Sequence, residues 1–336
     1  MKKIGIIYGI IHLLVEIICF QILYKEFAEP IITLSIAMIF DFFAFMPQSL
    51  IGVIADKYKT LKISYIGTIL MLIAIILATI NINNILTLFF LGIGNACLHE
   101  SGAIATTTID KPKLTPSAIF VGGGSFGVII GQTMGMFNIS LFCSYIAIIL
   151  IFILVFISNK QWITNNRKTV EFNLIKEHCN YWTVILIAFL IVTARSFIAY
   201  AIPISWKKEL WQSFLLFFTM GFGKMLGGIL SDIFGTKKIG ILSTILCIPF
   251  LLFGKNIMIL SIIGVFLFSM TMPITYGMLL SVLKKSPGLA FGITTIGLFI
   301  GLIPLFLFGS FSIEINNILI IILSIFSSFF LLKTLK

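Results

Sequence analysis

Long apolar stretches follow one another along almost the whole chain, and only short polar loops separate them. A helix of about 20 apolar residues crosses the hydrocarbon core of a lipid bilayer. The breaks in hydrophobicity predict twelve such helices, at 4–23, 30–54, 62–80, 85–107, 117–137, 139–158, 182–203, 210–231, 239–254, 257–282, 288–310 and 313–332. The sequence therefore predicts an all-α integral membrane protein.

The composition excludes most other classes of protein. Hydrophobic residues make up 59% of the chain and charged residues 10%, whereas a soluble domain carries about 25% charged residues. An ordinary soluble enzyme and a disordered chain are therefore excluded. The sequence has no phosphate-binding loop and no polar domain, so we expect no ATP-driven step, no enzymatic activity and no cofactor. The first apolar stretch carries His12 and Glu16 and lacks a small-residue cleavage site, so we expect a retained helix rather than a signal peptide.

Basic residues gather on one side of the predicted helices. With the N-terminus in the cytoplasm, the lysines in outer loops are Lys25, Lys207, Lys208 and Lys255. Lys224 lies two turns inside its helix, and we expect it to reach the cytoplasmic side by snorkelling. This bias follows the positive-inside rule and explains the net charge of +11 without a nucleic-acid partner. We expect a monomeric, multi-pass protein of the cell membrane with both termini cytoplasmic.

The lysine bias gives a first test, which concerns the topology. Reporter fusions should place Asn165 and Lys285 in the cytoplasm and Lys208 outside the cell, because the basic loops stay inside. The fusion at Lys208 is decisive. A cytoplasmic Lys208 would require an even number of crossings before it and would overturn the helix count.

The longest polar segment, at 159–181, divides the predicted helices into two groups of six. It contains lysine, arginine and glutamate residues, which predict a cytoplasmic linker. We therefore expect an N-terminal half at 1–158, the linker at 159–181 and a C-terminal half at 182–336.

Two short motifs occur at corresponding places in both halves. Gly52 and Asp56 lie at the end of the second helix, and a second pair lies at the end of the eighth helix with the same spacing, namely Gly228 and Asp232. The fifth and eleventh helices carry glycines with matching spacing: Gly122, Gly127 and Gly131 in one, and Gly292, Gly297 and Gly301 in the other. Such glycines allow helices to pack closely. Repeats in the same orientation predict two halves related by an axis along the membrane normal.

The loops that carry these aspartates resemble the Gly-x-x-x-Asp-(Arg/Lys)-x-Gly-(Arg/Lys) signature of the major facilitator superfamily. The matching residues are Gly52, Asp56 and Lys57 in the first copy, and Gly228, Asp232 and Gly235 in the second. In the second copy Ile233 and Thr236 stand at the basic positions, and Lys237 follows directly. Lys59 stands where the first copy should have its second glycine. The resemblance covers the whole chain and implies the fold of that superfamily, with twelve transmembrane helices in two six-helix pseudo-repeats. It also implies that Asp56 and Asp232 act at a cytoplasmic gate.

A stretch of the fourth helix resembles the fosmidomycin-resistance-type exporters of this superfamily. It reads Gly92-Ile-Gly94-Asn95-Ala-Cys-Leu-His99, and it is similar to their Gly-x-Gly-x-Ala-x-x-His pattern. Glu100 follows the histidine, where those exporters usually have proline or a small residue. This second resemblance implies export.

Ionisable residues lie inside several predicted transmembrane helices: His12, Glu16, Asp41, His99, Glu100 and Arg195. Such groups are costly at this depth and usually face a cavity or a partner. His12 and Glu16 lie one turn apart on one helix face, and so do Asn95 and His99. Glu100 is rotated by about 100° from His99. In the superfamily, helices 1, 4, 7 and 10 line the central cavity, so the resemblance implies that these residues bind substrate or protons.

The same residues also have structural interpretations. Arg195 could form an ion pair with one of the three acids, and His12 or His99 could make a hydrogen bond within the core. His12 and Glu16 alone supply too few ligands for a metal site, so we expect no metal.

The predicted cavity contains more acids than cations, and a poorly hydrated carboxylate takes up a proton readily. The leading prediction is therefore a proton-coupled secondary transporter of a small molecule, with export of a cationic or amphiphilic compound favoured. Two alternatives stay open. One is an uptake carrier in which Arg195 pairs with an anionic or zwitterionic nutrient, and the other is a lysolipid translocase.

Overall fold

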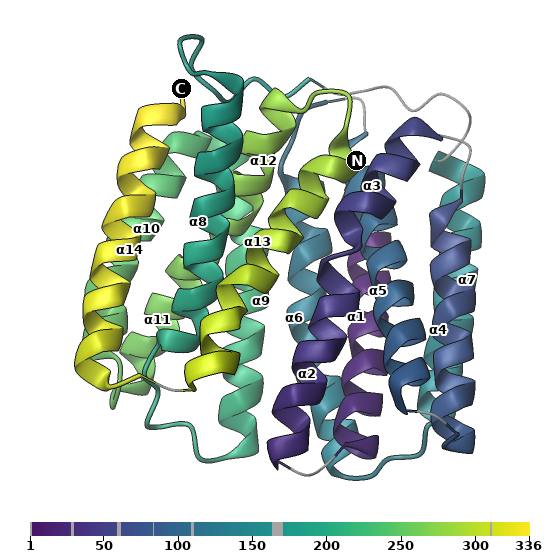
Figure 1. The fold of residues 1–336 in the computed structure, drawn as a ribbon. Helices are drawn as coiled ribbons and strands as arrows, with labels where there is room; N and C mark the ends of the chain where they lie inside the picture. The colour runs from purple at the N-terminus through teal and green to yellow at the C-terminus, as the bar shows by residue number, and fades with distance from the viewer. Residues whose placement is uncertain are drawn as a thin grey trace.

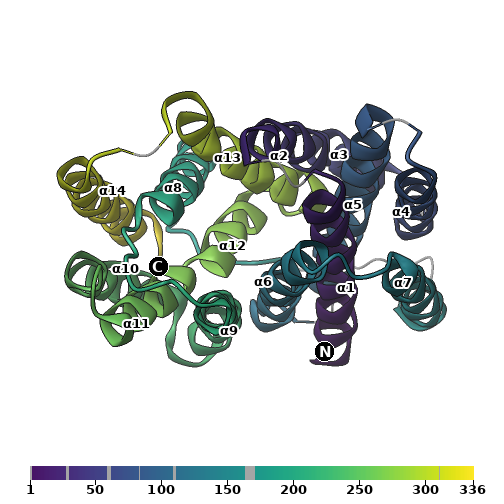
Figure 2. The ribbon, with the colours of Figure 1, turned by 90° about the horizontal axis from the view of Figure 1, so that it is seen from below.

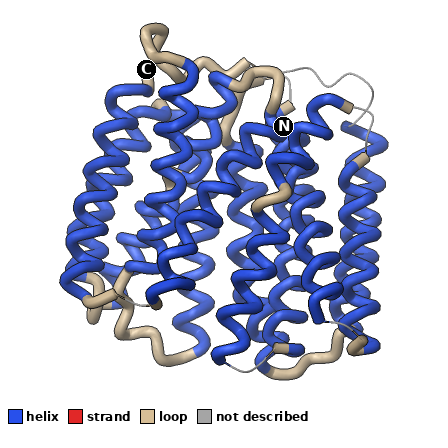
Figure 3. The backbone as a smooth tube through the Cα atoms, in the orientation of Figure 1, coloured by secondary structure: helices blue, strands red, loops and turns tan. Residues whose placement is uncertain are grey.

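The computed structural model describes residues 2–27, 30–58, 62–82, 84–108, 111–162, 171–309 and 311–336. The regular secondary structure in these ranges is helical, as Figures 1 and 3 show. The helices are α1 (Lys2–Glu26), α2 (Pro30–Phe45), α3 (Gln48–Lys57), α4 (Ile63–Ile80), α5 (Asn84–Thr107), α6 (Thr115–Met136), α7 (Phe142–Trp162), α8 (Tyr181–Ala201), α9 (Leu210–Phe234), α10 (Thr236–Phe253), α11 (Met258–Ser269), α12 (Met272–Val282), α13 (Pro287–Phe308) and α14 (Ile313–Thr334).

Twelve helical stretches among the described residues are long and apolar enough to cross a membrane. The helices α2 and α3 together make the second stretch, and α11 and α12 make the tenth. Proline explains both interruptions, because Pro47 directly precedes α3 and Pro273 lies in the first turn of α12. Neither residue has an N–H group for the carbonyl of the preceding turn. The twelve predicted transmembrane helices are therefore confirmed.

The helices form two groups that lie side by side, α1 to α7 and α8 to α14 (Figures 1 and 2). Both termini lie at the same end of the bundle (Figure 1). The loops at this end carry Lys57, Lys113, Lys237 and Lys285, and we call it the lysine-rich face.

The described end of the predicted linker packs on the C-terminal half. Phe172 and Ile175 are buried, and Ile175 forms an isolated antiparallel bridge with Leu335 near the C-terminus. Residues 163–170, which include Asn165, lie outside the described residues. The linker and the boundaries of the two halves therefore stay predictions.

A row of glycines brings the backbones of α1 and α6 into contact. Four glycines, each one turn from the next, face α1: Gly123, Gly127, Gly131 and Gly135. A methyl group on any of them would collide with a carbonyl oxygen of α1, in turn those of Gly9, Leu13, Ile17 and Gln21. At Gly131 the added carbon would lie 2.6 Å from the Ile17 oxygen. We call this row the glycine ladder, and it fixes α1 against α6 at the level of His12 and Glu16.

The C-terminal half repeats part of this pattern. Gly301 of α13 faces the carbonyl oxygen of Thr193 in α8, just as the ladder glycines face α1. Gly122 and Gly292 differ from the other glycines of the two predicted trios, because they face the opposite half. Close helix packing therefore accounts for both trios, within each half and between the halves.

The glycine ladder gives a prediction about stability. We expect Gly123→Ala to lower the stability of the protein by about 1–3 kcal/mol, because the new methyl group overlaps the backbone of Gly9 and the helices must separate. Gly240→Ala is the matched control, because the nearest atom to its added carbon is a flexible side-chain methyl group 3.4 Å away. Thermal unfolding in detergent should show a loss for the first variant only. Equal unfolding midpoints would mean that α1 and α6 are not held by this contact.

Candidate functional site

Three buried ionisable residues meet inside the N-terminal half. The helix α1 carries His12 and Glu16, and α5 carries His99. The Glu16 atom Oε1 lies 3.5 Å from His12 Nε2 and 3.1 Å from His99 Nε2. The exposed fractions are 8% for His12, 7% for Glu16 and 5% for His99. We call these three residues the His–Glu cluster.

Neighbouring groups orient the His–Glu cluster. His12 Nδ1 lies 2.9 Å from the backbone oxygen of Phe120 in α6, which fixes the imidazole ring. Asn95 Nδ2 donates a hydrogen bond of 3.2 Å to Glu16 Oε1. Asn95 is one turn before His99 on α5, so the face predicted from their spacing does meet Glu16.

The interruption between α2 and α3 supplies a further neighbour. Gln48, the first residue of α3 after Pro47, is completely buried. Its Nε2 donates to the Ala44 carbonyl at 2.7 Å and lies 3.5 Å from His99 Nδ1. Gln48 is absent from the site residues predicted from the sequence. The adjacent proline is the signal that would have found it, because a broken transmembrane helix often marks a binding site.

The other two predicted acids lie apart from the His–Glu cluster. Glu100 is completely buried, and neither of its carboxylate oxygens has a hydrogen-bond partner among the described residues. It lies within electrostatic range of Asp56, near the lysine-rich face. Asp41 lies within electrostatic range of Glu16 but forms no ion pair with a described residue. The predicted rotation between His99 and Glu100 explains why they face different surroundings.

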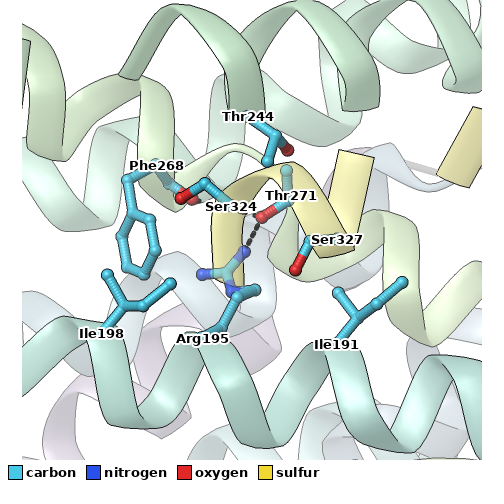
Figure 4. A pocket seen from close by; sticks show the side chains of 8 residues that line it. All are labelled: Ile191, Arg195, Ile198, Thr244, Phe268, Thr271, Ser324 and Ser327. Carbon is cyan, nitrogen blue, oxygen red and sulfur yellow. Dashed lines mark hydrogen bonds between the residues drawn. The ribbon is translucent and has the colours of Figure 1, made fainter. Parts of the chain in front are cut away.

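Arg195 lies in a small pocket of the C-terminal half (Figure 4). The lining residues come from α8, α10, α11, α14 and the break before α12: Ile191, Arg195, Ile198, Thr244, Phe268, Thr271, Ser324 and Ser327. Arg195 Nη1 donates a hydrogen bond to Thr271 Oγ1, and its guanidinium carbon lies 5.0 Å from the centre of the Phe268 ring. The cavity volume is about 10 Å³, which is room for about one water molecule.

This position contradicts one interpretation of Arg195, the ion pair with an acid. Arg195 forms no ion pair with any acid among the described residues. It also points into its own half, away from the His–Glu cluster. The physical reason is the break at Thr271, which places a hydroxyl group beside the guanidinium within the C-terminal bundle.

Lys224 was expected at the cytoplasmic end of its helix, and this prediction is wrong. Its Nζ donates a hydrogen bond of 2.8 Å to Ser125 Oγ on α6, across the boundary between the halves. Ser125 lies ten residues into α6, about 15 Å along the helix from its start. The Lys224 side chain does not extend to the cytoplasmic surface, because Ser125 offers a hydrogen-bond acceptor inside the bundle. The excess of acids in the predicted cavity is therefore smaller than the sequence count suggested.

Two aspartates join the halves at the lysine-rich face. Asp56, at the end of α3, accepts hydrogen bonds from the backbone N–H groups of Gly288 at 3.1 Å and Leu289 at 3.0 Å. These groups open α13 of the other half. The first N–H groups of a helix have no partner within it and carry partial positive charge, so a carboxylate is stabilised there.

Asp232 makes the symmetric contact. It accepts hydrogen bonds from the backbone of Leu114 at 2.9 Å and of Thr115 at 2.8 Å, and from the Thr115 hydroxyl at 2.6 Å. These residues open α6 of the N-terminal half. We call the contacts of Asp56 and Asp232 the two latches. Each half thus supplies one aspartate and receives the other.

The remaining residues of the predicted gate motif have different roles. Gly52 lies against the backbone of Gly288, so that a side chain at either position would separate the halves. Gly235 has φ of 95° and ends α9 in a conformation that favours glycine. Gly228 packs on α6, whereas Lys57 and Lys237 form no ion pair with a described residue. Lys59 lies outside the described residues.

Two halves of six membrane-crossing stretches, latched to each other at corresponding places, have the fold of the major facilitator superfamily. The chain is similar to a solved structure described as a major facilitator superfamily transporter, FucP, in the outward conformation. The identity is 14%, the TM-score is 0.67, and the match covers 98% of each chain. No protein-family model matches the sequence, and no curated protein matches it. The likeness shows the fold, and the resemblance to fosmidomycin-resistance-type exporters stays a prediction.

Proposed function

We propose that the protein is a secondary active transporter that moves a small organic solute across the membrane by alternating access, coupled to protons. One observation carries this proposal. Glu16 is buried between two imidazoles in the N-terminal half, and the Nε2 atoms of His12 and His99 lie 3.5 Å and 3.1 Å from its carboxylate oxygen. Such a group can hold a proton in one access state and release it in the other.

The latches support the alternating-access part of the proposal. They consist of hydrogen bonds between the halves, which can break and form again without unfolding either half. By the positive-inside rule this face is cytoplasmic, and the conformation is one with the cytoplasmic side closed.

The proposed substrate class is based on the charged residues inside the bundle. We favour a cationic or amphiphilic compound that is exported, because Glu16 and Asp41 both lie near the same region of the N-terminal half. A second candidate is uptake of an anionic or zwitterionic nutrient. The half-buried cation Lys224 favours it, since it lies at the boundary between the halves and forms no ion pair with a described acid.

The experiment is a screen for substrate-dependent proton movement. The protein is reconstituted in liposomes that contain a pH-sensitive dye, and amphiphilic cations, anionic metabolites and lysolipids are added in turn. Proton flux with cations that is lost in Glu16→Gln supports the first candidate. Flux with anions that is lost in Lys224→Gln, but not in the outer-loop control Lys255→Gln, supports the second. A solute that is transported without any proton movement would contradict the coupling.

A further inference from the structure

The His–Glu cluster has the composition of a transition-metal site. Two imidazole nitrogens and one carboxylate oxygen are ligands that Zn²⁺ and the neighbouring divalent ions prefer, whereas Ca²⁺ and Mg²⁺ prefer oxygen ligands only. His12 and Glu16 alone are too few for such a site. The fold adds the third ligand, because α5 places His99 against them.

The distances between the ligand atoms also fit. A tetrahedral metal ion with bonds of about 2.0–2.1 Å holds its ligand atoms about 3.3 Å apart. The two measured separations from Glu16 Oε1 are 3.5 Å to His12 Nε2 and 3.1 Å to His99 Nε2. All three ligand atoms lie within 4.8 Å of one another. A metal ion therefore needs only small movements of side chains that are already in place.

One imidazole nitrogen of the His–Glu cluster makes no hydrogen bond, despite its short distance to the carboxylate. His99 Nε2 is buried and has no hydrogen-bond partner in the described part of the chain, although it lies 3.1 Å from the Glu16 carboxylate. A ring N–H therefore does not point at this oxygen. An unpartnered nitrogen at a buried site costs free energy unless another ligand occupies its free direction.

The groups behind the imidazoles suit metal binding. His12 Nδ1 faces the Phe120 carbonyl oxygen at 2.9 Å, so this nitrogen carries the ring proton and Nε2 presents its lone pair to the cluster. On the other side, Gln48 lies behind His99 Nδ1, and its Oε1 has no partner among the described residues. The Gln48 Nε2 atom is held by the Ala44 carbonyl oxygen at 2.7 Å, so Gln48 packs beside His99 in a fixed orientation.

We propose that His12, Glu16 and His99 bind one first-row divalent transition-metal ion of the Zn²⁺ type. The proposal stands on the geometry of the His–Glu cluster and does not require the proposed function. Asn95 supports the site, because it donates to Glu16 Oε1 through Nδ2 and so helps to hold the carboxylate in place.

The test uses the full-length protein, purified in detergent without a histidine tag and stripped of metal. Co²⁺ is added first, because tetrahedral Co²⁺ has a visible absorption spectrum, and Zn²⁺ is then added to displace it. We expect one saturable equivalent of Co²⁺ with a tetrahedral spectrum, displaced by one equivalent of Zn²⁺. Calorimetry of Zn²⁺ binding gives the affinity of each variant.

The variants His12→Gln, His99→Gln and Glu16→Gln should each weaken Zn²⁺ binding by more than about tenfold. The control is His178→Gln, which changes the exposed histidine of the linker. Size-exclusion chromatography shows whether each variant is folded. If one histidine variant does not fold, the other still tests the site. Unchanged affinity in both folded histidine variants, octahedral Co²⁺ only, or a loss of binding in His178→Gln would overturn the proposal.

Discussion

Replacing Glu16 with glutamine is expected to abolish transport driven by a pH gradient while leaving exchange of substrate for substrate measurable. Glutamine has nearly the shape of the protonated acid, but it cannot take up or release a proton. The driven cycle needs Glu16 to change its protonation between the two access states. In exchange, the transporter changes its access state only with substrate bound, so no net movement of protons is needed. Driven transport should fall to the level of protein-free liposomes, with both activities measured side by side on one preparation.

The same pair of measurements separates coupling from structure. If Glu16 served only to hold His12 and His99 in place, its loss would lower thermal stability and abolish driven transport and exchange together. Glu177→Gln is the control, since Glu177 is an exposed acid of the linker outside the His–Glu cluster, and we expect it to retain driven transport. Normal driven transport by Glu16→Gln would contradict the proposal and make Asp41 the next candidate.

The second large effect is expected at the latches. In the double variant Asp56→Asn/Asp232→Asn, each asparagine offers one acceptor oxygen and a competing N–H₂ group to two backbone N–H donors. The favourable interaction of a negative charge with the helix start is also lost. We expect the closed lysine-rich face to be destabilised by roughly tenfold in its equilibrium, or about 1.4 kcal/mol, and transport to fall.

Opening can be measured with a thiol probe at Ser231, which is buried one turn from Gly228. Ser231→Cys, in a protein whose half-exposed Cys143 and Cys179 are replaced by serine, should react faster with a membrane-impermeant reagent when the latches are removed. Glu171→Gln is the matched control, because it removes an exposed acid from the same face. Equal labelling rates with and without the latches, or full transport at saturating substrate, would refute the gating role.

The sequence was sufficient for the fold because hydrophobic length and glycine spacing are properties of single helices. Proline at 47 and 273 also explains both helix breaks. Periodicity placed Asn95 with His99 and separated Glu100 from them, because 3.6 residues per turn determine which residues share a face.

Helical periodicity could not predict which neighbouring helix each helix face contacts. Arg195 lies in a helix that is apolar on all sides, so no hydrophobic stripe shows whether it faces the other half or its own bundle. Lys224 was misplaced for the same reason, since its acceptor Ser125 is 99 residues away in the other half. The third member of the His–Glu cluster likewise depends on how α1 and α5 cross.

The helix α6 connects the latch at Asp232 with the His–Glu cluster. Its first residue, Thr115, donates to Asp232, and Phe120, about 7.5 Å further along the same helix, accepts from His12. The glycine ladder then joins α6 to α1 without flexible side chains between them. A rigid connection of this kind implies thermodynamic linkage between the two sites. Closing of the latch changes the free energy of binding at the His–Glu cluster, and binding at the cluster changes the free energy of latch closure by the same amount. The affinity for Zn²⁺ should therefore differ between the wild type and the latch variants, and the ratio of the two constants gives the strength of that linkage.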